Sequence, residues 1–229
     1  MEYKSQYGVV MQNGQEEKYR RFKIDPHNSW NLNAREKQYR IFLFYKYFYA
    51  NDMPLIVTEG KTDVLYLKAA LKNFYKDYPN LVEKINDKFT FKIKFFRRSK
   101  RMQYFFNITA DGADTLENIY NHFIPSKDGN DYYGYLFKKS EIQPKNPVIL
   151  IFDNEQVTNK PLRKLKGHAK LSERQKAQFN KKLYCELIEN GNLFVLTHQL
   201  QNGKSECEIE DLFDQSTLCH IINGRSFSR

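Results

Sequence analysis

The chain has 229 residues, and its 18 phenylalanines, 16 tyrosines and overall hydrophobic fraction of 41% supply enough apolar surface for a core, which argues against general disorder. Lysine and arginine outnumber aspartate and glutamate by 37 to 27, and this net charge of +10 indicates a polyanionic partner such as nucleic acid, with an unspecific basic surface as the alternative. No apolar run approaches the ~18 residues of a membrane span, so we expect a soluble protein that binds no membrane. The three cysteines are odd in number and lack the close spacing of metal ligands, so we expect free thiols and a cytoplasmic protein.

The first third of the chain predicts a tail, a helix, a strand and a second helix. Residues 1–30 are polar and weakly periodic, which is typical of a tail or of the remnant of a preceding domain. Asn33 is a suitable N-cap for an aromatic-rich helix that runs to Ala50. The apolar run 55–58 then predicts a strand, which ends at Glu59 and Gly60 before an amphipathic helix over residues 62–75.

The middle of the chain predicts a hairpin with a basic tip. Residues 89–96 and 103–109 are rich in phenylalanine, isoleucine and threonine, which favours strands. The tip between them is a predicted phosphate contact, with an ordinary solvated turn as the alternative. Its four positive residues are Arg97, Arg98, Lys100 and Arg101, and Lys61 is a further predicted contact. A helix through residues 114–123 follows, and the many Pro, Gly, Asn and Asp residues of 125–146 predict a long connection.

The last third predicts a second central strand, a basic segment and a hairpin. Residues 148–152 form an apolar run of the kind found at the centre of a parallel sheet. Residues 160–182 are strongly basic; such a run is usually a solvated helix face, but we predict that its first part binds nucleic acid through Lys160, Arg163, Lys164 and Lys166. Asn190-Gly191 predicts a hairpin. The order of elements predicts an α/β fold with a Rossmann-like, mostly parallel central sheet, flanked by helices and extended by an antiparallel hairpin at its edge.

Carboxylates follow both apolar strands. Glu59 ends the first strand, Asp63 lies in the first turn of the next helix, and Asp153 and Glu155 follow the second strand. If the strands are neighbours, the four side chains converge, because the carboxyl ends of parallel strands share one edge of a sheet. Carboxylates this close need protons or cations, and oxygen ligands without nearby histidine or cysteine favour Mg²⁺ or Mn²⁺. The alternative is that Asp63 and Asp153 merely cap helices.

Other catalytic signatures are weak. Gly60-Lys61-Thr62 resembles the end of a phosphate-binding loop, but Leu55 stands where that loop needs a glycine. No Gly-x-Ser-x-Gly elbow occurs. The histidines have no ligand spacing, so we interpret them as surface or packing residues rather than zinc ligands: His27, His122, His168, His198 and His220.

The order strand, Glu-Gly-x-x-Asp, central glycine, strand, Asp-x-acid resembles the Toprim domain, which topoisomerases, bacterial primases, small ribonucleases and OLD-type nucleases share. More specifically, the chain resembles the Toprim region fused after the polymerase domain of certain bacterial retron reverse transcriptases. Four ordered blocks carry this resemblance: residues 32–37, 58–71, 148–154 and 210–213. It implies that residues 1–30 are a tail or the remnant of a preceding polymerase domain and that residues 31–229 are a Toprim nuclease domain.

The resemblance implies a site and an activity. It makes Glu59, Asp63, Asp153 and Glu155 metal ligands, with Glu59 and Asp153 catalytic, and it places Glu210 or Asp211 at or behind a second metal. The implied activity is Mg²⁺-dependent (or Mn²⁺-dependent) endonucleolytic cleavage of DNA or RNA. The implied role is that of the effector of a retron anti-phage system, restrained by a reverse transcriptase and its RNA–DNA hybrid; an oligomer is compatible with it.

The chain departs from the family pattern at two places. Glu155 stands where relatives have aspartate, and Asp111-Gly112 retains one glycine of a Gly-Gly segment. The chain also has no Tyr-x-Asp-Asp motif, so it encodes no reverse transcription. Two alternatives to a nuclease stay open. One is a non-catalytic module that binds nucleic acid and assembles the retron complex, and the other is topoisomerase-like transesterification through one of the 16 tyrosines.

Overall fold

The computed structural model describes residues 32–109, 114–124, 131–155, 160–168, 171–188, 191–201 and 203–219. The predictions for residues 1–30 and for Asp111-Gly112 lie outside these ranges. None of the helices in the described ranges has the length and apolar character needed to cross a membrane.

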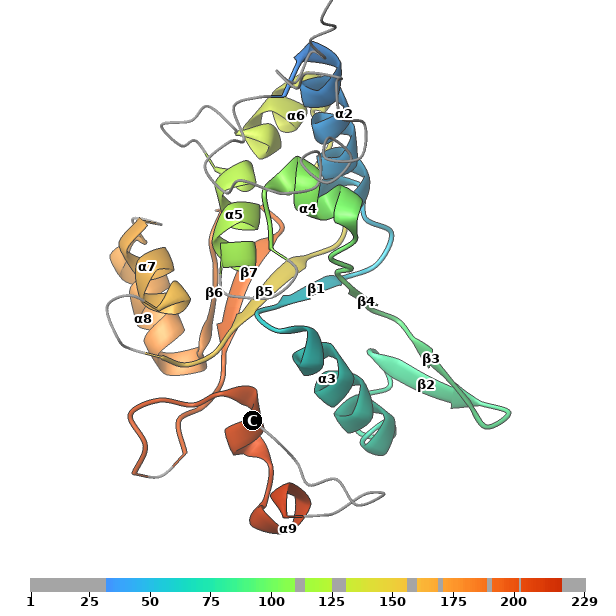
Figure 1. Cartoon of the computed structure of the whole chain (residues 1–229), viewed down its shortest axis with the longest axis vertical. Coiled ribbons are helices and arrows are strands. Elements are labelled where there is room, and N and C mark those ends of the chain that lie inside the picture. Colours follow the sequence, from blue (N-terminus) through green and yellow to red (C-terminus); the bar gives the residue numbers. More distant parts are fainter. Residues whose placement is uncertain are drawn as a thin grey trace, which may run out of the picture.

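A five-stranded sheet forms the centre of the fold, in the order β4-β1-β5-β7-β6 (Figure 1). Its strands are β1 (Leu55–Thr58), β4 (Lys94–Phe95), β5 (Val148–Phe152), β6 (Tyr184–Glu186) and β7 (Leu193–Thr197). All neighbouring strands are parallel except β6 and β7, which form the antiparallel edge. The predicted α/β fold with a mostly parallel sheet and an antiparallel edge hairpin is therefore confirmed.

The two apolar strands of the sequence are neighbours. In the pairing of β1 with β5, Leu55 lies opposite Val148 and Thr58 lies opposite Ile151. The two strands are therefore nearly in register, and the residues that follow them emerge at the same edge of the sheet. Figure 1 shows that the chain leaves both strands on the side that carries α3 (Lys61–Asn73) and the C-terminal segment.

Helices cover both faces of the sheet. Alternate strand residues such as Val57 and Leu150 point into the main core, which the larger group of helices closes. That group consists of α2 (Ala34–Phe44) with its π-helical extension η2 (Tyr45–Tyr49), α4 (Lys100–Phe106), α5 (Asp114–Phe123), α6 (Tyr132–Ser140), α7 (Pro161–His168) and α8 (Glu173–Lys182). On the other face, Ile56 and Ile151 pack against Leu67 and Leu71 of α3.

The predicted helix after Asn33 is confirmed. The Asn33 side chain accepts a hydrogen bond from the Glu36 N–H (3.0 Å), and the Glu36 carboxylate accepts one from the Asn33 N–H (3.1 Å). This reciprocal capping box starts α2. The helices predicted at 62–75 and 114–123 and the hairpin strands around Asn190-Gly191 are also present as α3, α5 and β6–β7.

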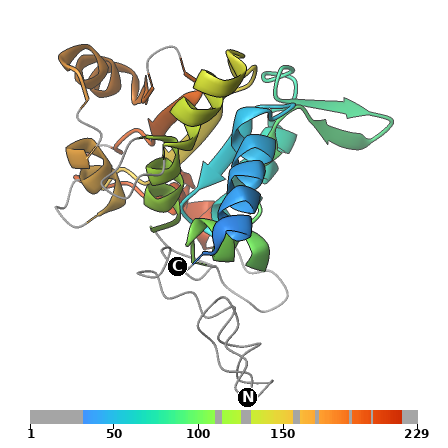
Figure 2. The same cartoon turned by 90° about the horizontal axis from the view of Figure 1, so that it is seen from above.

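The strand predicted at residues 103–109 is wrong, because residues 103–106 form the second half of α4 and residues 107–109 follow the end of that helix. Ser99 caps that helix by accepting a hydrogen bond from the Met102 N–H (3.3 Å), and Met102 and Phe106, four residues apart, are both buried. Of the predicted strand at 89–96, two short pieces form: part of β3 (Lys88–Phe91) and β4. The strand β3 pairs with β2 (Val82–Ile85) in a hairpin that projects from the body of the protein (Figures 1 and 2).

The connection predicted at residues 125–146 contains a helix, α6. Asp131 is its N-cap, because its side chain accepts a hydrogen bond from the Gly134 N–H (2.8 Å). Tyr132 and Tyr133 are buried in the main core. The aspartate and glycine that favoured a loop thus start a helix, whose aromatic residues are held by tertiary packing.

Candidate carboxylate site at the ends of β1 and β5

Glu59 and Asp153 lie next to each other. Each directly follows a strand of the parallel pair β1–β5, and the Asp153 N–H lies 3.4 Å from Oε2 of Glu59. Both side chains are half-buried. The convergence of the two strand ends that the sequence predicted is therefore present in the fold.

The charge of Glu59 is strongly disfavoured. Burial and, after it, the neighbouring Asp153 carboxylate raise the pKa of Glu59 from 4.5 to about 7, against the opposing hydrogen bond from the Asp153 N–H. The charges of Glu155 and Asp63 act in the same direction. The other three predicted carboxylates therefore lie within electrostatic reach of Glu59, and around neutral pH a proton on Glu59 relieves their repulsion of its charge.

Asp63 caps α3 and also lies close enough to Glu59 for its charge to raise the pKa of Glu59. Its Oδ2 accepts a hydrogen bond from the Gly60 N–H (2.7 Å), which caps α3, and its charge also acts on Glu59. The approach is so close that a Cβ on residue 60 would lie 2.6 Å from Oδ1 of Asp63. A larger residue at position 60 would therefore displace the Asp63 carboxylate from its capping position.

Arg98 braces the same turn. Its guanidinium donates hydrogen bonds to the backbone carbonyls of Thr58 and Glu59, the latter at 2.7 Å. The predicted hairpin tip that would offer Arg98 to phosphate is therefore wrong: residues 97–101 lead into and begin α4, and Arg98 is partly buried against the end of β1. The other basic residues of this segment, Arg97, Lys100 and Arg101, are exposed. Lys61, at the start of α3, is exposed as well.

Glu155 is buried and paired with a lysine. Only 5% of Glu155 is exposed, and its Oε1 lies 2.5 Å from Nζ of Lys160, which is itself half-exposed. The hydrogen bond to Glu155 raises the pKa of Lys160, and the charges of Glu206 and Glu59 add to this effect. Lys160, which we predicted as a nucleic-acid contact, thus lies among the carboxylates.

A segment distant in the sequence, residues 203–219, contributes a further carboxylate to the site. The backbone of Asn154 forms an antiparallel bridge with Cys207, with N–H to carbonyl distances of 2.8 and 3.1 Å. This bridge brings up the short 3₁₀-helix η3 (Ile209–Leu212). Burial raises the pKa of Glu210, and so do the charges of Asp63 and Asp153. Asp211 instead pairs with Lys204 (2.7 Å) and accepts a hydrogen bond from the Glu208 N–H (3.1 Å), whereas Glu210 interacts with the carboxylates of the site.

His198 is a site residue that the sequence analysis missed. Its Nε2 lies 3.4 Å from Oδ1 of Asp153, and its side chain is only 9% exposed. The Asn154 side chain donates to the His198 carbonyl (2.7 Å) and holds the backbone in place. His198 directly follows β7, the parallel neighbour of β5. Its position after a strand, which identified Glu59 and Asp153, is the signal that could have found it.

The donor set partly fits a divalent cation. Its oxygen ligands have the chemistry that Mg²⁺ and Mn²⁺ prefer. Within the described ranges, however, no three acidic, histidine or cysteine side chains are grouped closely enough to hold a metal ion. Asp63 is engaged by the Gly60 N–H and Glu155 by Lys160. A cation that binds beside Glu59 and Asp153 competes with the Gly60 N–H for Asp63 and with Lys160 for Glu155, whereas Glu210 takes part in neither of these bonds.

The remaining predicted contacts lie on α7. Arg163 is exposed and Lys166 is half-buried, and both line a cavity between α7 and α8. The side chain of Lys164 lies outside the part of the chain that the structure describes. The basic segment is thus divided between the carboxylate site, which Lys160 joins, and this separate cavity.

Comparison with known proteins assigns no family. No protein-family model matches the chain, and no solved structure gives a significant match. The function proposed below therefore depends on the residues and on the geometry of the carboxylates.

Proposed function

We propose that this chain is a Mg²⁺-dependent nuclease of the Toprim class that cuts phosphodiester bonds in DNA or RNA. The observation that carries the proposal is the pair of Glu59 and Asp153 at the ends of two adjacent parallel strands, with the pKa of Glu59 raised to about 7. Perturbed carboxylates at the carboxyl edge of a parallel sheet are typical of binding and catalytic sites.

Each residue of the site has a defined task in this proposal. Glu59 and Asp153 would hold the cation, with Asp63, Glu155 or Glu210 completing its shell. A bound Mg²⁺ supplies an activated water and stabilises charge on the phosphate. With its pKa about 7, Glu59 is also suited to move a proton near neutral pH. His198 orients Asp153, and Arg98 fixes the turn that carries Glu59.

We extend the proposal to the effector part of a retron anti-phage system, with a reverse transcriptase and its RNA–DNA hybrid as partners. Two observations support it. The blocks that resemble the retron Toprim region at 58–63, 148–154 and 210–213 meet at one edge of the sheet. The net charge of +10 suits a nucleic-acid partner.

A second candidate function is a nucleic-acid-binding assembly module that does not cleave. It is favoured by the internal partners of the carboxylates, because Asp63 caps a helix and Glu155 is neutralised by Lys160. In that case the acidic edge is a structural network. The two candidates differ in their need for metal: binding that persists in EDTA without cleavage in Mg²⁺ identifies the assembly module.

The deciding experiment compares Asp153→Asn with the wild type on labelled single- and double-stranded DNA and RNA, in Mg²⁺ and in EDTA. We expect cleavage by the wild type in Mg²⁺ and none by the variant, with unchanged circular dichroism. Asp87→Asn is a matched control, because Asp87 lies on the β2–β3 turn with a positive φ that asparagine tolerates. Equal cleavage by the wild type and Asp153→Asn would remove Asp153 from the catalytic site.

A further inference from the structure

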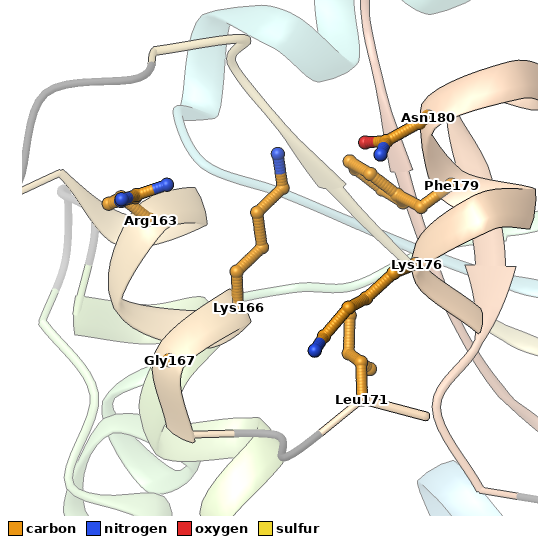
Figure 3. Close-up of a pocket in the computed structure, with 7 residues that line it drawn as sticks. All are labelled: Arg163, Lys166, Gly167, Leu171, Lys176, Phe179 and Asn180. Atoms are coloured by element: carbon orange, nitrogen blue, oxygen red, sulfur yellow. The ribbon is translucent and has the colours of Figure 1, made fainter. Parts of the chain in front are cut away.

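A basic cavity of about 480 Å³ lies between α7 and α8, apart from the carboxylate site. Figure 3 shows the side chains that line it: Arg163 and Lys166 come from α7, and Lys176, Phe179 and Asn180 come from α8. Its wall combines these three cations with an apolar surface made of Leu171 and Phe179. No acidic side chain of the described residues contributes to the lining.

The cations of this cavity repel one another. Lys166 is half-buried, with its Nζ 4.7 Å from the centre of the buried Phe179 ring. Burial lowers the pKa of Lys166, and the charge of Arg163 lowers it further. Lys176 lies 2.7 Å from Glu173, whose side chain is 89% exposed, and such surface pairs are weak and easily exchanged. The concave surface therefore has a positive potential that an anion would relieve.

We propose that this cavity is a binding site for a phosphate group. Phosphate oxygens can accept hydrogen bonds from the guanidinium of Arg163, the ammonium groups of Lys166 and Lys176, and the amide of Asn180. The volume lies in the range of small-ligand sites and exceeds that of one phosphate, so it leaves room for an attached sugar or base against Leu171 and Phe179. The phosphate belongs either to a nucleic-acid strand or to a free nucleotide.

The site goes beyond the proposed cleavage chemistry. It lies on α7 and α8 rather than at the ends of β1 and β5, and its binding groups are cations that need no metal. Lys160, which pairs with Glu155 at the carboxylate site, immediately precedes α7. A strand held in the cavity would therefore be anchored by a helix that begins beside the carboxylates.

The test measures binding by the 229-residue chain in EDTA, so that its outcome does not depend on cleavage. Inorganic phosphate and adenosine 5′-monophosphate are titrated by calorimetry, and a short labelled single-stranded DNA by fluorescence anisotropy. The variant is Lys166→Met, which keeps an unbranched apolar side chain over Phe179 and removes a partly buried charge, so we expect it to fold. Lys181→Met is the matched control: it removes the same charge from α8, at an exposed residue outside the cavity.

We expect saturable binding of inorganic phosphate by the wild type and Lys181→Met, and binding about tenfold weaker or more in Lys166→Met. If the DNA competes with phosphate and Lys166→Met weakens both, the phosphate is that of a strand; if only the nucleotide competes, it is that of a free nucleotide. Absence of saturable phosphate binding by the wild type, or equal weakening in both variants, would overturn the proposal. Both results are independent of whether Asp153→Asn abolishes cleavage.

Discussion

Replacing Glu59 by glutamine tests the acidic edge directly. Glutamine keeps the size of the side chain and removes its charge, so the variant resembles the protonated residue. Because the pKa of Glu59 rises from 4.5 in the unfolded chain to about 7 in the fold, the ionised side chain destabilises the folded state. We therefore expect Glu59→Gln to be more stable than the wild type at alkaline pH.

The sign and size of the effect follow from the two pKa values. Below pH 4.5 Glu59 is protonated in both states, and its contribution to stability is fully present. That contribution is lost as the pH rises towards 7, since the unfolded chain has released the proton and the fold has not. The loss amounts to at most about 3.5 kcal/mol, at about 1.4 kcal/mol for each pH unit between the pKa values. Above pH 7 the advantage of Glu59→Gln is constant.

The assay is urea unfolding of both proteins between pH 4 and pH 8.5, in EDTA and in Mg²⁺. Mg²⁺ should stabilise the wild type above pH 7, because it binds the ionised carboxylate in the folded state, and should stabilise Glu59→Gln less. Glu83→Gln, on the exposed β2–β3 hairpin, is the control and should follow the wild type. A stability difference between Glu59→Gln and the wild type that does not change with pH would refute the electrostatic reasoning. Equal stabilisation of both by Mg²⁺ would remove Glu59 from the metal site.

Two further predictions concern the cations beside the site. Lys160→Met should destabilise the protein in EDTA by about 1–2 kcal/mol, because it leaves the buried Glu155 without its lysine partner. In thermal unfolding, Mg²⁺ should restore part of this loss. An unchanged melting temperature in the variant would contradict the pairing of Lys160 with Glu155. Arg98→Met should cost about 2–3 kcal/mol in urea unfolding, because the carbonyls of Thr58 and Glu59 lose a charged donor. A loss below about 0.5 kcal/mol, the level of an ordinary surface substitution, would contradict the bracing role.

The placement of the central carboxylates was predictable from local signals. Leu55–Thr58 and Val148–Phe152 are short apolar runs, and β1 is buried at every position while β5 is buried at four of five. A carboxylate after each run, combined with the common edge of parallel strands, was enough to bring Glu59 and Asp153 together. The Asn33 cap and the Asn190-Gly191 hairpin depended in the same way on short-range chemistry.

The sequence-based predictions were wrong or incomplete where tertiary contacts determine the secondary structure or the position of a side chain. Residues 103–109 have the composition of a strand, but residues 103–106 belong to a helix that Ser99 caps and that buries Met102 and Phe106 on one side. His198 was grouped with the other histidines because it has no ligand spacing to another histidine, cysteine or glutamate, although it follows an apolar strand. Its position beside Asp153 depends on the pairing of β5 with β7, which the sequence does not specify.

Three carboxylates of the acidic edge have different partners that stabilise them without a metal. Glu59 takes up a proton with a pKa of about 7, Glu155 forms an ion pair with the Lys160 ammonium, and Asp63 accepts a hydrogen bond from the Gly60 N–H. A nuclease must exchange at least one of these partners for its cation, whereas an assembly module retains all three. In the enzyme alone, we therefore expect Mg²⁺ to change the pH at which Glu59 is half-protonated and to change the effect of losing Lys160. An acidic network that responds to the proton and to Lys160 but not to Mg²⁺ is a structural element of the fold.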